Sequence, residues 1–249
     1  MKIAIVGIGS IGSTLARKLV SAGHEVSVAN SRGKEAVRAF SAEVGAAPCD
    51  LKDVFDGADA VILAIPLPAM TALPKNLLAV LSSSTPVVDT SNYYPGLRDE
   101  CIDALENGQT ESIWVSEQLG RPVIKAFNNI LAYSLEHLSK PKDAENRLGV
   151  AVAGDDANHK RLVMQLVDAV GFDPVDGGRL EASWRQQPCT PAYCCDYTAD
   201  EMTPALNAAV KGAAAQKREA YNTQILTLFA KNPSHNEVVE FNRNFNAAG

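Results

Sequence analysis

A glycine-rich stretch close to the amino terminus constrains the fold of this chain more than any other feature. Residues 2–7, KIAIVG, are typical of a strand buried on both faces of a parallel sheet. Apolar residues then recur every four positions from Ile11 to Leu19, which predicts a helix. Between the two stands GIGSIG, whose glycine spacing is typical of a dinucleotide-binding turn with the pyrophosphate at the helix amino terminus. The expected cofactor contacts of this turn are Gly7, Gly9, Ser10, Ile11 and Gly12.

The end of the second predicted strand, within EVSVANSRGKEA (25–36), bears on the choice of cofactor. An NAD-selective site would place an acidic residue there to accept hydrogen bonds from the ribose hydroxyls, but position 30 is an asparagine. Ser31 can donate a hydrogen bond, Arg32 can form a bidentate clamp, and Lys34 adds positive charge. We therefore expect Asn30 and these three residues to bind the 2′-phosphate of NADP. The alternative is an ordinary solvated turn.

The remaining pattern predicts an α/β fold with a Rossmann-like, doubly wound and mostly parallel sheet of about eight strands. Further strands are expected within residues 59–66, 86–92, 122–129 and 147–154, with a strand or turn at 173–178. Ligands of such sheets bind at the carboxyl ends of the strands. Additional cofactor contacts are therefore expected at Ala64, Ile65, Pro66, Asn92, Ala126 and Asn128. The prolines could instead simply end a strand, and the asparagines could cap a helix.

Composition narrows the class of protein. The 249 residues, 46% of them hydrophobic, suffice for one sizeable core with a small appended element. The net charge of -6 and the absence of a Lys/Arg run argue against a nucleic-acid partner. No apolar run approaches the ~20 residues that span a bilayer, and the amino terminus does not read as a secretory signal. We expect a cytoplasmic protein with no membrane partner that acts on a small molecule.

Several segments together resemble one family, the NADPH-dependent oxidoreductases related to the enzymes that reduce the 8-hydroxy-5-deazaflavin coenzyme. The segments are GIGSIG, NSRG, VILAIP, VVDTSN, IKAFN and DGGRLEASWRQ, which follow the family's order over roughly residues 1–190. The same module resembles the NADPH-binding domain of membrane metalloreductases. The resemblance implies NADP as the cofactor and direct hydride transfer from nicotinamide C4 to a planar acceptor such as a deazaflavin, flavin or quinone.

Hydride transfer between stacked rings requires positioning more than acid–base groups, and we assign no catalytic residue. The histidines show neither metal-ligand nor triad spacing. They are His24, His137, His159 and His235. Three cysteines close together lack a partner CxxC or HxxxH pair, so no metal is expected. They are Cys189, Cys194 and Cys195.

The part of the chain after the nucleotide-binding pattern reads as a helical extension. We predict an NADP-binding domain over 1–180 and a loop with helices over 181–249. Thr203 and Pro204 predict the start of a long Ala-rich helix with Val210 on its apolar face. These helices are too few to form a domain alone, so we expect them to pack on the sheet domain or on the second subunit of a homodimer.

A capping-box pattern at Ser234 and Glu237 predicts a last short helix.

Two other functions are compatible with parts of the sequence. A dehydrogenase of the β-hydroxyacid or pyrroline-carboxylate type would share the first half, but it would need a large helical second domain for which too few residues remain. A non-catalytic NADP(H)-sensing module would also lack an acid or base. We expect a substrate pocket at Asn129, Trp184 and Arg185, because an aromatic ring and a cation beside the nicotinamide would suit a planar anionic acceptor.

Overall fold

The chain forms one eight-stranded sheet that is parallel over most of its width. The computed structural model describes residues 1–74 and 76–247, and its strand order is β3-β2-β1-β4-β5-β6-β7-β8. Among the described residues, only the pairing of β6 with β7 is antiparallel. The strands are β1 (Lys2–Val6), β2 (Glu25–Ala29), β3 (Ala47–Pro48), β4 (Ala60–Leu63), β5 (Val87–Asp89), β6 (Ile124–Lys125), β7 (Gly149–Ala153) and β8 (Asp173–Gly178). The predicted mostly parallel Rossmann-like sheet is therefore confirmed.

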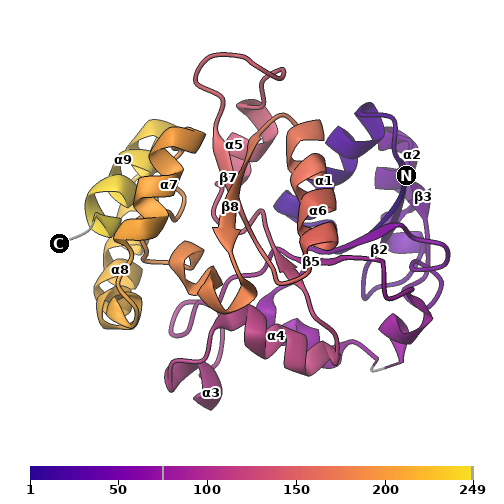
Figure 1. The fold of residues 1–249 in the computed structure, drawn as a ribbon, viewed down its shortest axis with the longest axis horizontal. Coiled ribbons are helices and arrows are strands. Elements are labelled where there is room, and N and C mark those ends of the chain that lie inside the picture. The colour runs from indigo at the N-terminus through magenta and orange to yellow at the C-terminus, as the bar shows by residue number, and fades with distance from the viewer. Residues whose placement is uncertain (75, 248–249) are drawn as a thin grey trace.

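Helices cover both faces of this sheet (Figure 1). One face packs on α1 (Ser10–Ser21), α2 (Glu35–Val44), α5 (Ala132–His137) and α6 (Ala157–Ala169). The other packs on α3 (Asp103–Glu106), α4 (Glu111–Leu119) and the 3-10 segments η1 (Leu67–Ala72), η2 (Leu77–Val80) and η3 (Leu180–Gln186). Side chains of β1 alternate between the two cores, with Ile3 and Ile5 in one and Ala4 and Val6 in the other. This double burial explains the continuous apolar run at the amino terminus.

The strands differ in two details from the sequence pattern. We did not predict β3, because a two-residue strand that contains Pro48 has no apolar alternation to reveal it. Residues 173–178, which the sequence left as a strand or a turn, form β8 and pair in parallel with β7.

Three helices follow the sheet and lie together beside its β8 edge (Figure 1). They are α7 (Ala199–Ala208), α8 (Ala213–Phe229) and α9 (His235–Asn246). Met202 and Leu206 of α7 pack on Ala151 of β7 and Val175 of β8. The predicted capping box of Ser234 and Glu237 at the start of α9 is confirmed. Within the described residues, no helix is long and apolar enough to cross a bilayer.

The prediction of one long helix beginning at Thr203 was wrong. Thr198 caps α7 instead, because Thr198 and Glu201 form a capping box, and Pro204 lies inside the helix. The chain then leaves the helix, and Gly212 starts α8 with a φ of 85° that favours glycine. Val210 falls in this break and is 68% exposed, so it does not lie on a buried face.

The glycine-rich turn after β1 contains two crowded glycines, Gly7 and Gly12, and one open glycine, Gly9. A Cβ atom at Gly12 would lie 1.9 Å from the carbonyl oxygen of Gly7 and 2.9 Å from the Cβ of Ala64, so only glycine lets α1 approach the turn. At Gly9, which precedes α1, a Cβ atom would meet nothing within 4 Å. The protein itself therefore requires glycine at position 12, whereas position 9 faces open space.

We expect Gly12→Ala to lower the free energy of unfolding by at least about 2 kcal/mol, because the added methyl group would collide with backbone. Gly9→Ala is the matched control and should change it by less than about 0.5 kcal/mol. Urea unfolding followed by circular dichroism measures both. Equal losses of stability would contradict the crowding seen at Gly12.

Candidate active site

A cavity of about 320 Å³ lies at the carboxyl ends of β1, β4, β5 and β6. These strands are parallel neighbours, so their carboxyl ends meet at one edge of the sheet. The cavity is walled by residues that directly follow each strand. Those among the predicted cofactor contacts are Gly9, Ser10, Ile11, Ala64, Ile65, Pro66, Asn92 and Asn128.

Three further predicted cofactor residues are buried next to the cavity and do not line it. Gly7 and Gly12 are buried in the turn that carries Gly9, and Ala126 is wholly buried in the core beside β6.

The three residues expected to bind the substrate lie elsewhere. Asn129 is buried and donates from Nδ2 to the carbonyl oxygen of Ala192 at 3.2 Å, which ties the carboxyl-terminal segment to the sheet. Trp184 lines a separate cavity under α8. Arg185 donates to the carbonyl oxygen of Gly177 at 2.8 Å. The expected substrate pocket at these residues therefore does not coincide with the cavity at the strand ends.

The Asn128 amide is already engaged within the protein. Its Nδ2 donates to Oδ1 of Asn92 at 3.0 Å and to the carbonyl oxygen of Gln186 at 2.8 Å. Its Oδ1 accepts from Nε2 of Gln186 at 2.8 Å. These bonds join the loops after β5 and β6 to η3. Asn128 therefore shapes the cavity wall, and Gln186, which we did not predict, holds it there.

The turn after β2 is built around the side chain of Asn30. Oδ1 of this buried residue accepts a hydrogen bond from the backbone N–H of Arg32 at 2.9 Å. Gly33 follows with a φ of 85°, and the backbone N–H of Lys34 donates to Oδ1 of Asp50 at 2.9 Å. The side chains of Ser31, Arg32 and Lys34 are exposed at this corner, beyond the lining of the cavity. Asn30 thus shapes the turn that presents them.

Ten further described residues line the cavity, and for four of them no sequence pattern pointed to this role. These four are Tyr94, Arg98, Tyr193 and Cys194. Arg98 donates to the carbonyl oxygen of Asn92 at 2.7 Å, and its guanidinium lies 4.8 Å from the ring centroid of Tyr94. The hydroxyls of Tyr94 and Tyr193 share a hydrogen bond. Since 99 residues separate the two tyrosines, only the tertiary structure brings them together.

The three clustered cysteines lie in the irregular segment between η3 and α7 and are buried there. Burial raises the pKa of Cys189 to about 12 and that of Cys195 to about 12, and it raises the pKa of Cys194 well above its usual value. These thiols therefore stay protonated at neutral pH, which makes them poor nucleophiles and poor metal ligands. In the described part of the chain, no three His, Cys, Asp or Glu side chains are grouped so as to hold a metal ion.

Comparison with known proteins identifies the family. Residues 2–93 match the family described as NADP oxidoreductase, coenzyme F420-dependent. YjhV of Escherichia coli K12 is 39% identical over 112 residues, which are 45% of this chain and 81% of that protein. The chain belongs to the family of coenzyme F420-dependent NADP oxidoreductases. The resemblance read from the sequence motifs is therefore confirmed.

Three further proteins match about three quarters of the chain. The SMa0349 protein of Sinorhizobium meliloti is 31% identical, with a TM-score of 0.63 over 75% of this chain and 89% of that chain. A protein of Arthrobacter sp. FB24 described as an F420-dependent NADP reductase shares the fold, at 23% identity and a TM-score of 0.60 over 74% and 87% of the two chains. Metalloreductase STEAP3 of Rattus norvegicus is 27% identical over 191 residues, 76% of this chain but 36% of that protein.

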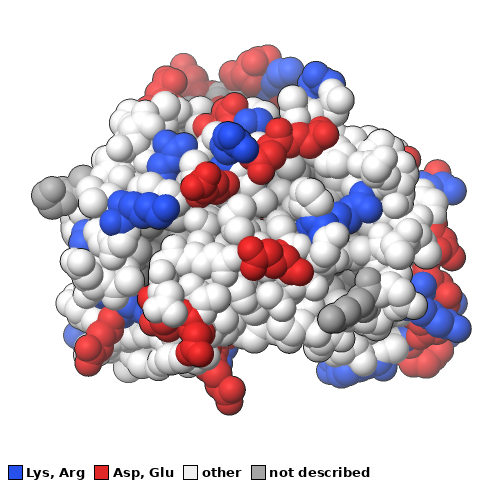
Figure 2. Space-filling model, turned by 60° about the horizontal axis from the view of Figure 1, so that its bottom comes forward, with Lys and Arg blue, Asp and Glu red and all other residues white. Residues whose placement is uncertain are grey.

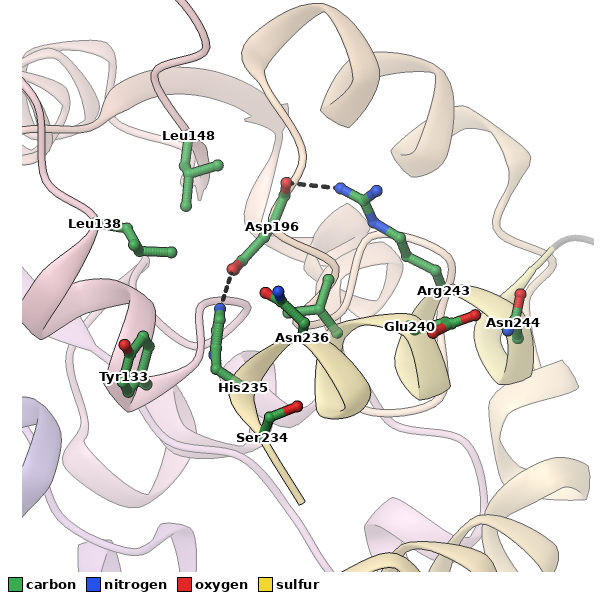
Figure 3. Close-up of a pocket in the computed structure, with 11 residues that line it drawn as sticks. Tyr133, Leu138, Leu148, Asp196, Ser234, His235, Asn236, Glu240, Arg243 and Asn244 are labelled. Atoms are coloured by element: carbon green, nitrogen blue, oxygen red, sulfur yellow. Dashed lines mark hydrogen bonds and ion pairs between the residues drawn. The ribbon is translucent and has the colours of Figure 1, made fainter.

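A second cavity, of about 730 Å³, separates α9 from α5 in this member of the NADP oxidoreductase family (Figure 3). His235, at the start of α9, contacts Oδ2 of Asp196 through Nε2 at 2.7 Å and stacks on the ring of Tyr133. Asp196 also accepts a hydrogen bond from the hydroxyl of Ser134 at 2.7 Å. His235 thus docks α9 on the sheet domain and does not line the cavity at the strand ends.

Charge on the molecular surface is mixed. On the face drawn in Figure 2, Lys and Arg side chains are interspersed with Asp and Glu and form no continuous basic patch. This face lacks the clustered cations that nucleic-acid binding requires.

A cluster of buried charged residues lies beneath the strand-end cavity, and we did not predict it from the sequence. Lys125, the last residue of β6, is wholly buried, and its Nζ lies 3.1 Å from Oδ2 of Asp89 and 2.5 Å from the carbonyl oxygen of Ser91. Asp89, the last residue of β5, also accepts hydrogen bonds from the hydroxyls of Ser91 at 2.6 Å and Ser112 at 2.7 Å. The sequence did contain a signal for this cluster, because a charged residue ends each of two apolar strand segments, Asp89 in β5 and Lys125 in β6. The cluster fixes the ends of β5 and β6 side by side.

Glu111, the first residue of α4, is the third buried charge of this cluster. Its Oε2 lies 3.9 Å from Nζ of Lys125 and lacks a hydrogen-bond partner among the described residues. Burial raises the pKa of Glu111 to about 7, against the attraction of the Lys125 ammonium, and the Asp89 carboxylate adds to the rise. Glu111 therefore changes its charge near neutral pH.

This raised pKa predicts a pH-dependent stability. The folded protein holds the Glu111 proton up to about pH 7, whereas the unfolded chain loses it near pH 4.5, so the free energy of unfolding should fall as pH rises between these values. At about 1.4 kcal/mol per pH unit over this interval, the contribution is on the order of 3 kcal/mol. Glu111→Gln cannot titrate and should remove this part of the pH dependence.

Urea unfolding of both proteins at several pH values from 5 to 8 tests the assignment. Glu117→Gln, at an exposed glutamate of the same helix, is the control and should follow the wild-type curve. A Glu111→Gln curve parallel to the wild-type curve would refute the assignment of this pKa.

Proposed function

We propose that this protein binds NADP(H) at the strand-end cavity and transfers a hydride between nicotinamide C4 and a planar acceptor such as a deazaflavin, flavin or quinone. The observation that supports cofactor binding most directly is the open space at Gly9, beside the amino terminus of α1. In the described residues, no side chain caps the first N–H groups of α1, so they are available to a pyrophosphate. The nicotinamide would then extend along Ile65 and Pro66.

The turn after β2 supports NADP over NAD. Asn30 carries no charge that would repel a 2′-phosphate, and it folds the turn so that Ser31 and Arg32 are exposed at the corner of the sheet. A guanidinium can bind a phosphate through two charge-assisted hydrogen bonds. We propose Asn30, Ser31, Arg32 and Lys34 as the site for this phosphate.

Arg32→Ala should weaken NADPH binding by about 1.5–3 kcal/mol, roughly 10- to 150-fold, because charge-assisted hydrogen bonds of this strength are lost. NADH binding should stay nearly unchanged. Calorimetric titration of both cofactors measures the difference.

Two variants frame this experiment. Arg38→Ala, at an exposed arginine of α2 that pairs with Glu35, should leave both affinities unchanged. Gly9→Ala should weaken both cofactors alike, because its methyl group would occupy the approach of the pyrophosphate. An Arg32→Ala protein that lost NADPH and NADH equally would exclude a 2′-phosphate contact.

The lining of the cavity favours a reaction that needs no carboxylate or imidazole. Of the described residues that wall it, none is an Asp, Glu or His. Apolar walls and fixed loops hold two rings together, and such positioning can supply much of the acceleration of a hydride transfer. A non-catalytic sensor of NADP(H) would bind the cofactor in the same way but would not turn it over.

We expect NADPH oxidation with at least one deazaflavin, flavin or quinone, followed at the nicotinamide absorbance band. With NADPH deuterated on one or the other face of C4, only one of the two forms should pass its label to the acceptor, because a bound nicotinamide exposes one face. His137→Ala, His159→Ala and His235→Ala should each change turnover only a few-fold. Tight NADPH binding without turnover of any acceptor would instead support the sensor.

The remaining expectations belong to the same proposal. A homodimer could use the exposed apolar residues Leu226 and Phe229 of α8. The domain boundary near residue 180 and the cytoplasmic location also stay predictions.

A further inference from the structure

We infer that the hydroxyl pair of Tyr94 and Tyr193 binds the acceptor in the strand-end cavity, and that the acceptor is a conjugated carbonyl compound whose oxygen accepts a hydrogen bond from this pair. The inference rests on the proposed hydride transfer and names the class of acceptor. It differs from the pocket expected from the sequence, because it uses residues of the cavity itself.

The polar side chains of the cavity leave few groups that could serve such an oxygen. The Thr90 hydroxyl donates to the carbonyl oxygen of Leu63 at 3.2 Å, and the Ser91 hydroxyl donates to Asp89 at 2.6 Å. The Asn92 amide donates to the carbonyl oxygen of Asn128, and the Asn128 amide donates to Oδ1 of Asn92 and to the carbonyl oxygen of Gln186. We call these groups committed donors, because each already donates a hydrogen bond within the protein. The described lining residues with such commitments are Thr90, Ser91, Asn92, Arg98 and Asn128.

The two phenols differ from these committed donors. One hydroxyl donates to the other in the bond between Tyr94 and Tyr193, so the pair uses one of its two protons and retains one for a ligand. Burial raises the pKa of both phenols well above the usual value, so both stay protonated through the physiological range. Ser10 is exposed at the glycine-rich turn before α1, and Cys194 offers only a weakly donating thiol.

Contacts on each side hold the two tyrosines in place. The Arg98 guanidinium covers the Tyr94 ring at 4.8 Å and pairs with Asp99 at 2.7 Å. On the other side, the carbonyl oxygen of Tyr193 accepts a hydrogen bond from Asn246, the last residue of α9, at 3.3 Å. The backbone N–H of Cys194 donates to the carbonyl oxygen of Asn129 at 3.0 Å. The segment between η3 and α7, which α9 anchors through Asn246, therefore completes a cavity whose other walls follow the strands of the sheet.

This arrangement suits a particular charge movement. When the C4–H bond of the dihydronicotinamide breaks, its electron pair forms a bond to the acceptor carbon, and the displaced π electrons move onto the conjugated oxygen. The nicotinamide becomes a cation, the oxygen becomes an anion, and water then supplies the proton that completes the reduction. A preorganised donor aimed at such an oxygen lowers the barrier of the hydride step and is worth about 10²–10³-fold in kcat.

Tyr94→Phe and Tyr193→Phe, compared with wild type, test the inference. With a quinone or deazaflavin acceptor, each should lower kcat at least tenfold, and the double variant should be little worse than the poorer single variant, because the two hydroxyls act as a unit. The Kd of NADPH should stay within about twofold. Tyr221→Phe is the matched control, since it removes a buried hydroxyl that bonds Asn242 outside the cavity.

An acceptor without a carbonyl group separates a chemical role from a structural one. With a phenazinium dye as the acceptor, Tyr94→Phe and Tyr193→Phe should match the wild-type rate. If both acceptor types slow equally, or if neither does, the inference fails while the hydride-transfer function stands. If the wild-type protein oxidises NADPH with none of the acceptors tested, the proposed function is overturned, and this inference with it.

Discussion

The buried ion pair of Lys125 and Asp89 is the interaction on which the site depends most. Removing two charges from water is costly, and the cost is offset only where the remaining donors and acceptors are satisfied. Here the hydroxyls of Ser91 and Ser112 and the carbonyl oxygen of Ser91 meet that need. The pair lies at the ends of two short strands, β5 and β6, that have few ladder hydrogen bonds of their own. It therefore sets where the loops that wall the cavity begin.

The sheet changes direction one strand beyond this ion pair. β6 is the last strand of the parallel series, and β7 runs antiparallel to it. The Asn128 amide, just after β6, links the loop after β5 to η3, which follows β8. Loops from both halves of the sheet are thus joined through one buried asparagine. This joint explains why η3 and the segment between η3 and α7 shape a cavity that a shorter parallel sheet would leave open.

The carboxyl-terminal helices have a structural basis and a consequence for the site. α7 packs on β7 and β8, α8 and α9 share a small aromatic core around Tyr221, and His235 docks α9 against Asp196. None of these contacts lies within residues 2–93, which match the family model. Their position beside the β8 edge carries Tyr193 and Cys194 into the cavity. The cavity beside the family-matched residues 2–93 is therefore completed by a segment about 100 residues farther along the chain.

Local sequence determined the features that depend on neighbouring residues. The apolar run 2–6, the GIGSIG turn and the capping box at Ser234 each carry their own geometric requirement, so their structures followed from the pattern. The doubly wound sheet followed as well, since strands and helices alternate along the chain. Only the tertiary structure decided the ion pair of Lys125 with Asp89, the meeting of Tyr94 with Tyr193 and the break between α7 and α8. The first two depend on contacts between residues distant in sequence, and the third depends on a competition between helix caps. Such contacts and competitions leave no periodic signal along the chain.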